Sequence, residues 1–159
     1  MIIKKGNKTD RTAMMENAIY DYFHNTLGIR LEHEVYVSTG IVDFLGFIKE
    51  EDEIMDVIAI EIKQSSADFH SGCGLNFVGV SNYVAVPSEL VGYAIEFLRN
   101  NYMNYVGVME VNHTGMVRLV IPPMAYLHND FVRICVGTIT PYHIISPFQK
   151  VRQNNRNAR

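Results

Sequence analysis

The sequence predicts an α/β domain of three layers, in which a mixed β-sheet lies between helices. The first observation is that segments 41–48 and 55–63 have strand-like composition and are largely apolar at both alternating sets of positions. Strands of this kind belong in a sheet whose two faces are both covered. The second observation is that apolar residues recur at helical spacing in segments 9–26 and 88–100, which precede and follow these strands.

The first half of the chain is expected to form a helix followed by three strands. Thr9 or Asp10 can cap the helix, which runs to about Thr26, and Gly28 is a plausible stop signal. The strands are expected at residues 31–37, 41–48 and 55–63. Residues 49–53 are charged and predict a solvated hairpin loop between the last two strands.

The second half is expected to alternate helices with strands. Residues 65–72 predict a short helix, whereas the glycine-rich stretch that continues to Val80 favours no single structure. The remaining elements are expected as a strand at 82–86, a helix at 88–100, and strands at 105–111 and 116–121 joined by a turn.

Length and composition fit one soluble domain. The chain has 159 residues, of which 48% are hydrophobic and 19% charged. We expect a single domain over residues 1–148 and a basic, disordered tail over 149–159. Two cysteines are too few for a disulfide framework, no signal peptide is evident, and no apolar run approaches the roughly 20 residues that span a bilayer. These features predict a cytoplasmic protein without a membrane partner.

The charge distribution argues against one class of nucleic-acid-binding protein. The formal net charge is −3, but the last ten residues hold four of the 14 basic side chains and no acid. Residues 1–149 therefore carry a formal charge of −7. A uniformly basic nucleic-acid surface is disfavoured, whereas binding through a local basic patch or with the help of a metal ion remains open.

Two acids and a lysine are expected to meet where the start of the second strand lies beside the end of the third. Glu61 and Lys63 are two residues apart in a strand and share a face. If the hairpin turn is centred on Asp52, Asp43 lies opposite Glu61 with the Cβ atoms about 5 Å apart. Carboxylates at that separation repel, so a divalent cation is one natural counter-ion. Glu16, on the inner edge of the first helix, is a third acid near this site.

An ordinary interpretation of these residues remains open. Glu61 and Lys63 could form a charged pair at a strand end, with Asp43 an acid close to a turn. Two features favour a functional site instead. The charges lie in otherwise apolar strands, and a carboxylate is rarely buried unless it is paired or bound to a metal.

The order of these residues resembles the PD-(D/E)xK superfamily of restriction-endonuclease-like nucleases. The chain has a helix with Glu16, a strand, a strand with Asp43, and a strand that ends in Glu61-Ile62-Lys63. More narrowly, EIKQSSADF at 61–69 and NYVAVP at 82–87 resemble the bacterial MmcB-like DNA-repair family. This resemblance covers about residues 12–125. The glycine-rich stretch at 72–79 departs from it, because a charged, aromatic-rich segment is expected there.

The resemblance implies a restriction-endonuclease-like core and metal-assisted hydrolysis of DNA phosphodiester bonds. Glu16, Asp43, Glu61 and the carbonyl of Ile62 would hold one or two Mg²⁺ ions, for which Mn²⁺ can substitute. Lys63 would position or deprotonate the attacking water, or stabilise the charged phosphate. The expected catalytic residues are therefore Lys63, Asp43 and Glu61.

The expected partner is DNA, in repair or in the processing of phage DNA. Gln64 and Ser65 would contact the phosphate backbone, although polar residues after a strand are more often simple turn formers. A homodimer is left open. Two other functions also stay open: a catalytically weak nucleic-acid-binding module of the same fold, and a non-enzymatic interaction protein whose acids solvate a strand end.

Overall fold

The computed structural model describes residues 9–37, 39–50, 53–72 and 74–125. The apolar stretch 131–148 and the expected tail at 149–159 lie outside the described residues. In chain order the elements are α1 (Asp10–Asp21), the π-helical turn η1 (Tyr22–Thr26), β1 (Leu31–Val37), β2 (Gly40–Glu50), β3 (Glu53–Ile62), α2 (Ser66–His70), β4 (Ser81–Pro87), the 3₁₀ turn η2 (Ser88–Leu90), α3 (Val91–Asn100), β5 (Gly107–Val111) and β6 (Val117–Ile121).

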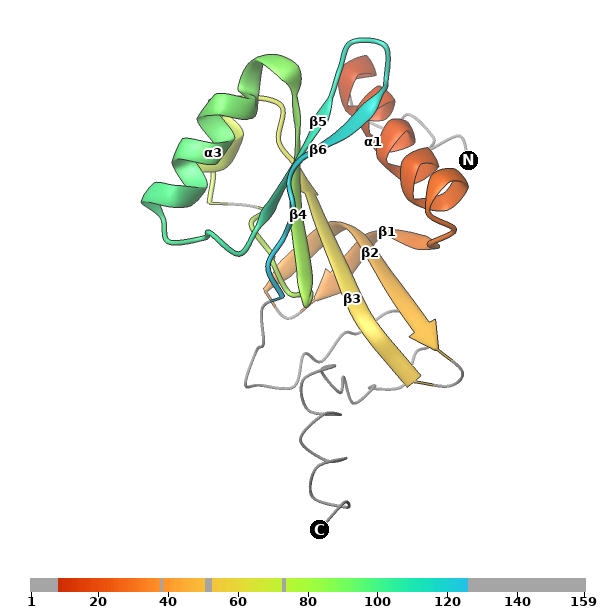
Figure 1. Ribbon diagram of the computed structural model, residues 1–159. Helices are drawn as coiled ribbons and strands as arrows, with labels where there is room; N and C mark the ends of the chain where they lie inside the picture. Colours follow the sequence, from red (N-terminus) through yellow and green to blue (C-terminus); the bar gives the residue numbers. More distant parts are fainter. Residues whose placement is uncertain (1–8, 38, 51–52, 73, 126–159) are drawn as a thin grey trace.

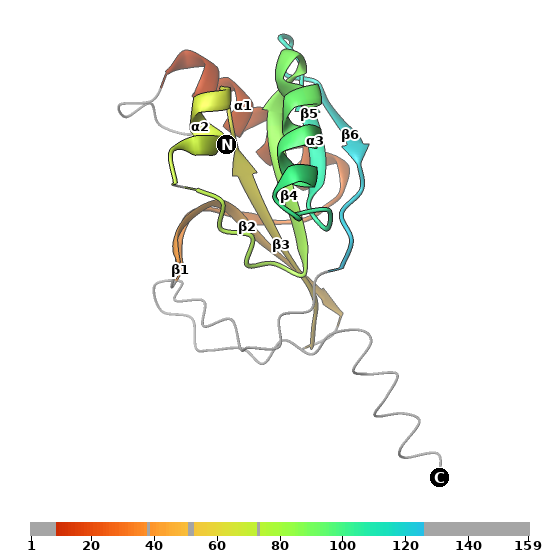
Figure 2. The same cartoon turned by 90° about the vertical axis from the view of Figure 1, so that its left-hand side faces the viewer.

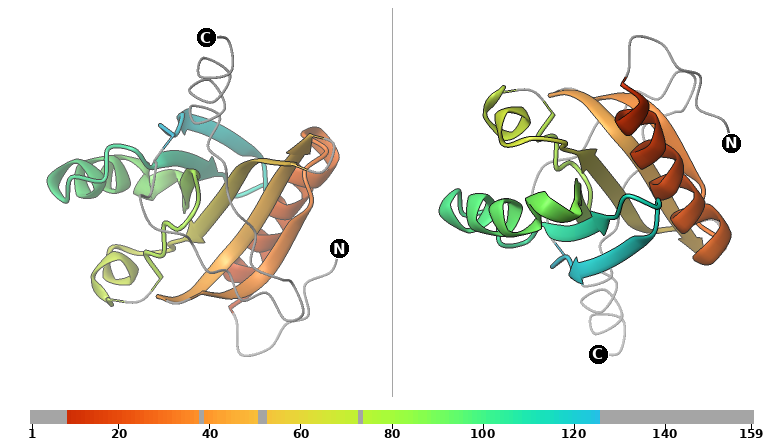
Figure 3. Two further views of the ribbon diagram at one scale, coloured as in Figure 1. Left: turned by 90° about the horizontal axis from the view of Figure 1, so that it is seen from below. Right: turned by 90° about the horizontal axis from the view of Figure 1, so that it is seen from above.

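The strands form one mixed sheet of six strands, in which the spatial order follows the chain order. β1, β2 and β3 pair antiparallel, β4 is parallel to both β3 and β5, and β6 is antiparallel to β5. Figures 1 and 3 show α1 on one side of this sheet and α2 and α3 on the other. The three-layer α/β architecture predicted from the sequence is confirmed.

α1 covers one face of the sheet because its apolar residues recur at helical spacing. Thr9 caps the helix by accepting a hydrogen bond from the backbone N–H of Thr12. Met15 and Ile19 are fully buried and belong to a core cluster with residues of β1, β2, β3, β4 and β5. Glu16 is buried on the same helix, so its carboxylate lies at the inner side of α1.

The opposite face is covered in two places. Over β4 and β5, α2 and α3 enclose a cluster of Phe69, Phe77, Val84, Val86, Ala94, Leu98, Val106 and Val108. Over β1, β2 and β3, the partly buried Val78 packs against a third cluster of Val35, Val42, Leu45, Val57 and Ala59. Because β2 and β3 contribute to clusters on both faces, their sequences are almost continuously apolar.

The β2–β3 hairpin has the register that the sequence predicts, but its strands are longer. Phe44 pairs with Ile60, and the same register continues to the pair of Ile48 and Asp56. A β-bulge between Ile48 and Lys49 then shifts the pairing, which extends as far as the two ends at residues 50 and 53. The expectation of a loop over residues 49–53 is therefore wrong, because the ladder continues through most of this charged segment.

The parallel arrangement of β3, β4 and β5 brings their carboxyl ends to one edge of the sheet. The backbone N–H of Lys63 donates to the carbonyl of Ala85 at 3.0 Å, which continues the β3–β4 pairing past the end of β3. Figure 2 shows α2 directly after the arrowhead of β3 at this edge. The residues that the sequence marks as functional therefore lie where three strands end together. Among the described residues, no helix is long and apolar enough to cross a membrane.

Substitution of Asn82 tests how the segment before β4 is held. Asn82 is fully buried; its side chain accepts from the backbone N–H of Gly79 and donates to the Gly79 carbonyl, both at 2.8 Å. In Asn82→Asp the side chain keeps its shape but loses its donor and brings a buried charge towards a carbonyl oxygen. We expect the free energy of unfolding to fall by about 2–4 kcal/mol, as measured by urea denaturation.

Asn101→Asp is the matched control, because Asn101 also donates to a backbone carbonyl, that of Phe97, at 2.8 Å but in an exposed position. There water can replace the lost bond, so the expected cost is below about 1 kcal/mol. Equal costs at the two positions would contradict the role given to Asn82.

Candidate active site

The end of the β2–β3 ladder brings Asp43, Glu61 and Lys63 together. The β2–β3 pairing begins at Phe44 and Ile60, and Asp43 and Glu61 are the residues that come next on the two strands. The Oδ2 atom of Asp43 accepts a hydrogen bond of 2.7 Å from the backbone N–H of Ile62. The Asp43 carboxylate thus accepts a hydrogen bond that a backbone carbonyl of β2 would accept if the pairing continued. This bond fixes the position of the Asp43 side chain beside Glu61.

Glu61 is a buried carboxylic acid with too little positive charge around it. Its exposed fraction is 1%, and its Oε1 accepts from the backbone N–H of Asn76 at 3.1 Å. Burial, followed by the negative charge of Asp43, raises the pKa of Glu61 from 4.5 to about 8, although the Asn76 hydrogen bond and the Lys63 charge act in the opposite direction. The charge of Lys63 alone therefore does not offset the cost of burying Glu61 next to the Asp43 carboxylate.

Lys63 is buried beside Glu61, under the segment that follows α2. Its exposed fraction is 5%. A Cβ atom placed on Gly74 would lie 2.8 Å from the Nζ atom of Lys63 and 3.1 Å from Oε2 of Glu61. Two residues later, Asn76 bonds Glu61 with its backbone N–H and the carbonyl of Ile41 with its Nδ2 at 2.9 Å. Residues 74–76 therefore lie over the site and are fastened to β2 and β3.

The donor atoms suit a hard divalent cation. Asp43 and Glu61 provide carboxylate oxygens, which Mg²⁺ and Mn²⁺ prefer over nitrogen or sulfur. A Cβ atom at Gly74 would clash with Nζ of Lys63 and crowd Oε2 of Glu61, so the glycine lets the backbone approach these two side chains closely. A cation bound to both acids would add positive charge next to the buried Glu61 and the half-buried Asp43. The residues present thus fit the expected metal.

Glu16 lies in a different group of side chains. Its Oε1 is 3.3 Å from Nε2 of His33, and ligand atoms of Glu16, His33 and Glu34 lie within 4.8 Å of one another. This is the sole group of three or more potential metal-ligating residues found within the described parts of the chain, so Asp43 and Glu61 do not form such a group with Glu16. The sequence signal for Glu16 was its place on the inner helix face, which left its partners undetermined.

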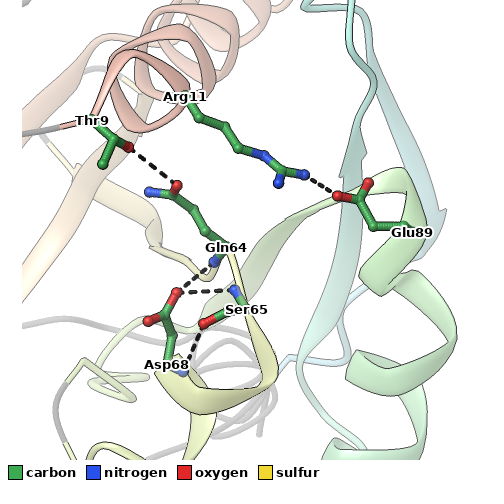
Figure 4. A network of polar contacts seen from close by, with 6 residues as sticks. All are labelled: Thr9, Arg11, Gln64, Ser65, Asp68 and Glu89. Carbon is green, nitrogen blue, oxygen red and sulfur yellow. Dashed lines mark hydrogen bonds and ion pairs between the residues drawn. The ribbon is translucent and has the colours of Figure 1, made fainter.

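Gln64 and Ser65, expected to contact DNA phosphates, have partners within the protein (Figure 4). The Gln64 side chain bonds the hydroxyl groups of Thr9 and Thr12 at the start of α1. Ser65 caps α2 by accepting from the backbone N–H of Asp68, whose carboxylate accepts in return from the N–H of Ser65 at 3.0 Å. The Gln64 side chain thus joins α1 to the end of β3, and the Ser65 side chain caps α2.

A surface ion pair flanks this network. Arg11 of α1 bonds Glu89 of η2 in an exposed position (Figure 4). Since exposed ion pairs contribute little to stability, the pair marks a place where α1 and the β4–α3 connection meet. The same edge of the sheet therefore holds α1, α2 and η2 around the carboxyl ends of β3 and β4.

The sequence did not reveal four residues that shape these sites. Asn76 and Gly74 belong to the glycine-rich stretch, where only the cluster of glycines signalled an unusual backbone. His33 and Glu34 belong to β1, where nothing in the sequence pattern distinguishes them from other polar strand residues. Each becomes recognisable through a contact with a residue distant in the chain.

Comparisons with known proteins do not assign the chain to a family. No protein-family model, no curated protein and no solved structure matches it. The similarity to the PD-(D/E)xK superfamily therefore rests on the motif residues and on the order of the elements that carry them.

The buried Glu61 predicts a pH dependence of stability in the metal-free protein. With a folded-state pKa of about 8 against 4.5, Glu61 keeps a proton that the unfolded chain releases within this interval. The free energy of unfolding should therefore fall as the pH rises from about 4.5 to about 8, by on the order of several kcal/mol, and then level off. Urea denaturation in EDTA measures this slope. Glu61→Gln, which cannot ionise, should flatten it; equal slopes in both proteins would rule out Glu61 as the cause.

Two glycine substitutions distinguish the effect of backbone strain on Mn²⁺ affinity from the effect of crowding at the site. Gly72 and Gly74 have φ angles of +70° and +67°, and alanine at either position is strained by about 1–2 kcal/mol. Nothing lies within 4 Å of a Cβ at Gly72, whereas a Cβ at Gly74 displaces the ammonium of Lys63. We expect only Gly74→Ala to change Mn²⁺ affinity in calorimetric titrations. Unchanged Mn²⁺ affinity in both variants would contradict the placement of a cation beside Gly74.

Proposed function

We propose that the protein is a Mg²⁺-dependent nuclease that hydrolyses phosphodiester bonds in DNA. The observation that carries the proposal is the convergence of Asp43, Glu61 and Lys63 at the end of the β2–β3 ladder, with both Glu61 and Lys63 buried. The order of α1, β1, β2 and β3, and the positions of the motif residues on them, agree with the resemblance to PD-(D/E)xK nucleases.

The proposed metal ligands are Asp43, Glu61 and the carbonyl of Ile62. Ile62 lies between the two buried charges, and its own N–H is held by Asp43. Glu16, the fourth expected ligand, is not required, because its carboxylate lies with His33 and Glu34. When bound, Mg²⁺ supplies activation of water and stabilisation of negative charge on the phosphate.

Lys63 provides the positive charge that belongs to the protein itself. Held beside Glu61, its ammonium can neutralise charge on a phosphate oxygen or take part in proton transfer. In a domain whose first 149 residues carry a formal charge of −7, such local positive charge is needed for a polyanionic substrate to approach. Because Glu61 and Lys63 are almost fully buried, residues 74–76 must move aside when substrate binds.

This burial is also the observation that favours the alternative function, a nucleic-acid-binding module without catalysis. If residues 74–76 stay in place, Glu61 and Lys63 remain buried and serve only to stabilise the end of β3. DNA would then contact the outer surface of this edge, and no cleavage would follow.

A nuclease assay with matched variants tests the proposal. Single-stranded, duplex, flapped and branched DNA are incubated with the protein and Mg²⁺ or Mn²⁺. Asp43→Ala and Glu61→Gln should lose metal affinity and cleavage together, with partial rescue by excess Mn²⁺. Lys63→Ala should keep its Mn²⁺ affinity but cleave about 10²–10⁴-fold more slowly, without rescue by metal. Lys49→Ala, an exposed lysine of β2, is the control and should cleave normally.

The possible failures are distinguishable by calorimetry with Mn²⁺. Wild-type protein that binds Mn²⁺ at Asp43 and Glu61 but cleaves none of the substrates would support the binding module. Lys63→Ala that cleaves as fast as wild type would remove Lys63 from the chemistry. Absence of Mn²⁺ binding at these residues would leave the acids as a charged strand end.

A further inference from the structure

A second set of metal-ligating side chains lies between α1 and β1. Ligand atoms of Glu16 from α1 and of His33 and Glu34 from β1 all lie within 4.8 Å of one another. Glu16 is 2% exposed, the His33 side chain is 15% exposed, and Glu34 is exposed. The set thus extends from a buried carboxylate to one that faces solvent, which gives an ion a way in.

The backbone of β1 is shaped so that two neighbouring residues reach the same point. Successive residues of a strand normally point to opposite faces, so His33 and Glu34 should diverge. Glu34 instead has a φ of +52°, a left-handed conformation that is unfavourable for a residue with a Cβ atom. This local departure from strand geometry explains how both ligand atoms come close to Glu16.

The spacing of Glu16 and His33 is compatible with two ligands around one metal ion. Oε1 of Glu16 and Nε2 of His33 are 3.3 Å apart. Metal–ligand bonds of about 2.0–2.1 Å at a tetrahedral angle place two donor atoms roughly 3.3–3.4 Å apart. The same separation also lies within the range of a histidine–carboxylate ion pair. His33 is also held against Phe44, with ring centroids 5.0 Å apart, which limits rotation of the imidazole.

We propose that Glu16, His33 and Glu34 bind one divalent transition-metal ion of the Zn²⁺ class. An imidazole with two carboxylates is a donor set that suits Zn²⁺ and related ions, whereas Mg²⁺ prefers oxygen ligands alone. With three protein ligands, a coordination position stays available for water or for a ligand from solution. This site shares no residue with the ligands proposed for Mg²⁺, and the proposal stands independently of the nuclease activity.

The experiment measures Zn²⁺ binding in a variant that lacks the proposed Mg²⁺ ligands. In the Asp43→Asn/Glu61→Gln background, EDTA-treated protein is titrated with Zn²⁺ in a calorimeter, and with Co²⁺ as a spectroscopic probe of imidazole coordination. We expect one Zn²⁺ per chain. Adding His33→Gln or Glu34→Gln should weaken this binding on the order of 100-fold or more. Glu32→Gln, a neighbouring residue of β1 that pairs with Arg30, is the control and should leave Zn²⁺ affinity unchanged.

A substitution of the strained residue separates a metal ligand from a structural residue. Glu34→Gly removes one ligand and relieves the left-handed strain, so its metal-free unfolding midpoint should be no lower than that of wild type. Zn²⁺ should then raise the unfolding midpoint of wild type but not that of Glu34→Gly. Because Glu34 is exposed, this variant should fold even if His33→Gln does not.

Two results would overturn the proposal. One is the absence of Zn²⁺ binding in the Asp43→Asn/Glu61→Gln background. The other is Zn²⁺ affinity that stays unchanged after both His33→Gln and Glu34→Gln. Either result can occur whether or not the protein cleaves DNA, so this test and the nuclease assay fail separately.

Discussion

The burial of Glu61 opposite Asp43 is the constraint on which the rest of this edge of the sheet depends. A carboxylate taken out of water without a partner is costly by several kcal/mol, and a second negative charge nearby adds to that cost. The chain answers with three features: the backbone N–H of Asn76, the ammonium of Lys63 and a retained proton, as the raised pKa of Glu61 indicates. A divalent cation would replace the proton, and this exchange is the basis of the proposed metal binding.

The contacts around the site follow from this constraint. The N–H of Asn76 reaches Glu61 only if residues 74–76 cross the strand end closely, and that crossing leaves no room for a side chain at position 74. Residues 74–76 of the glycine-rich stretch, which departs from the MmcB-like pattern, therefore lie over Glu61 and Lys63.

The sequence was sufficient for features that depend on local pattern and periodicity. The alternation of apolar residues in β2 and β3, with an acidic segment between them, determined the register that places Asp43 beside Glu61. It failed for features decided by tertiary contacts. Continued pairing with β3 drew Lys49 into the ladder, and the contact of Glu16 with His33 depends on how α1 lies over β1. The left-handed conformation of Glu34 has no signature in a strand of ordinary composition.

Glu34 of one proposed metal site and Asp43 of the other lie on neighbouring strands of the sheet. On the β1–β2 ladder, the pairs His33 with Phe44 and Val35 with Val42 bracket Glu34 and Asp43. Ions at the two sites would repel each other, so occupancy of one site should weaken affinity at the other. In an acidic domain, bound cations would add to the positive charge of Lys63, and under the proposed function this would link metal binding to the approach of a polyanion.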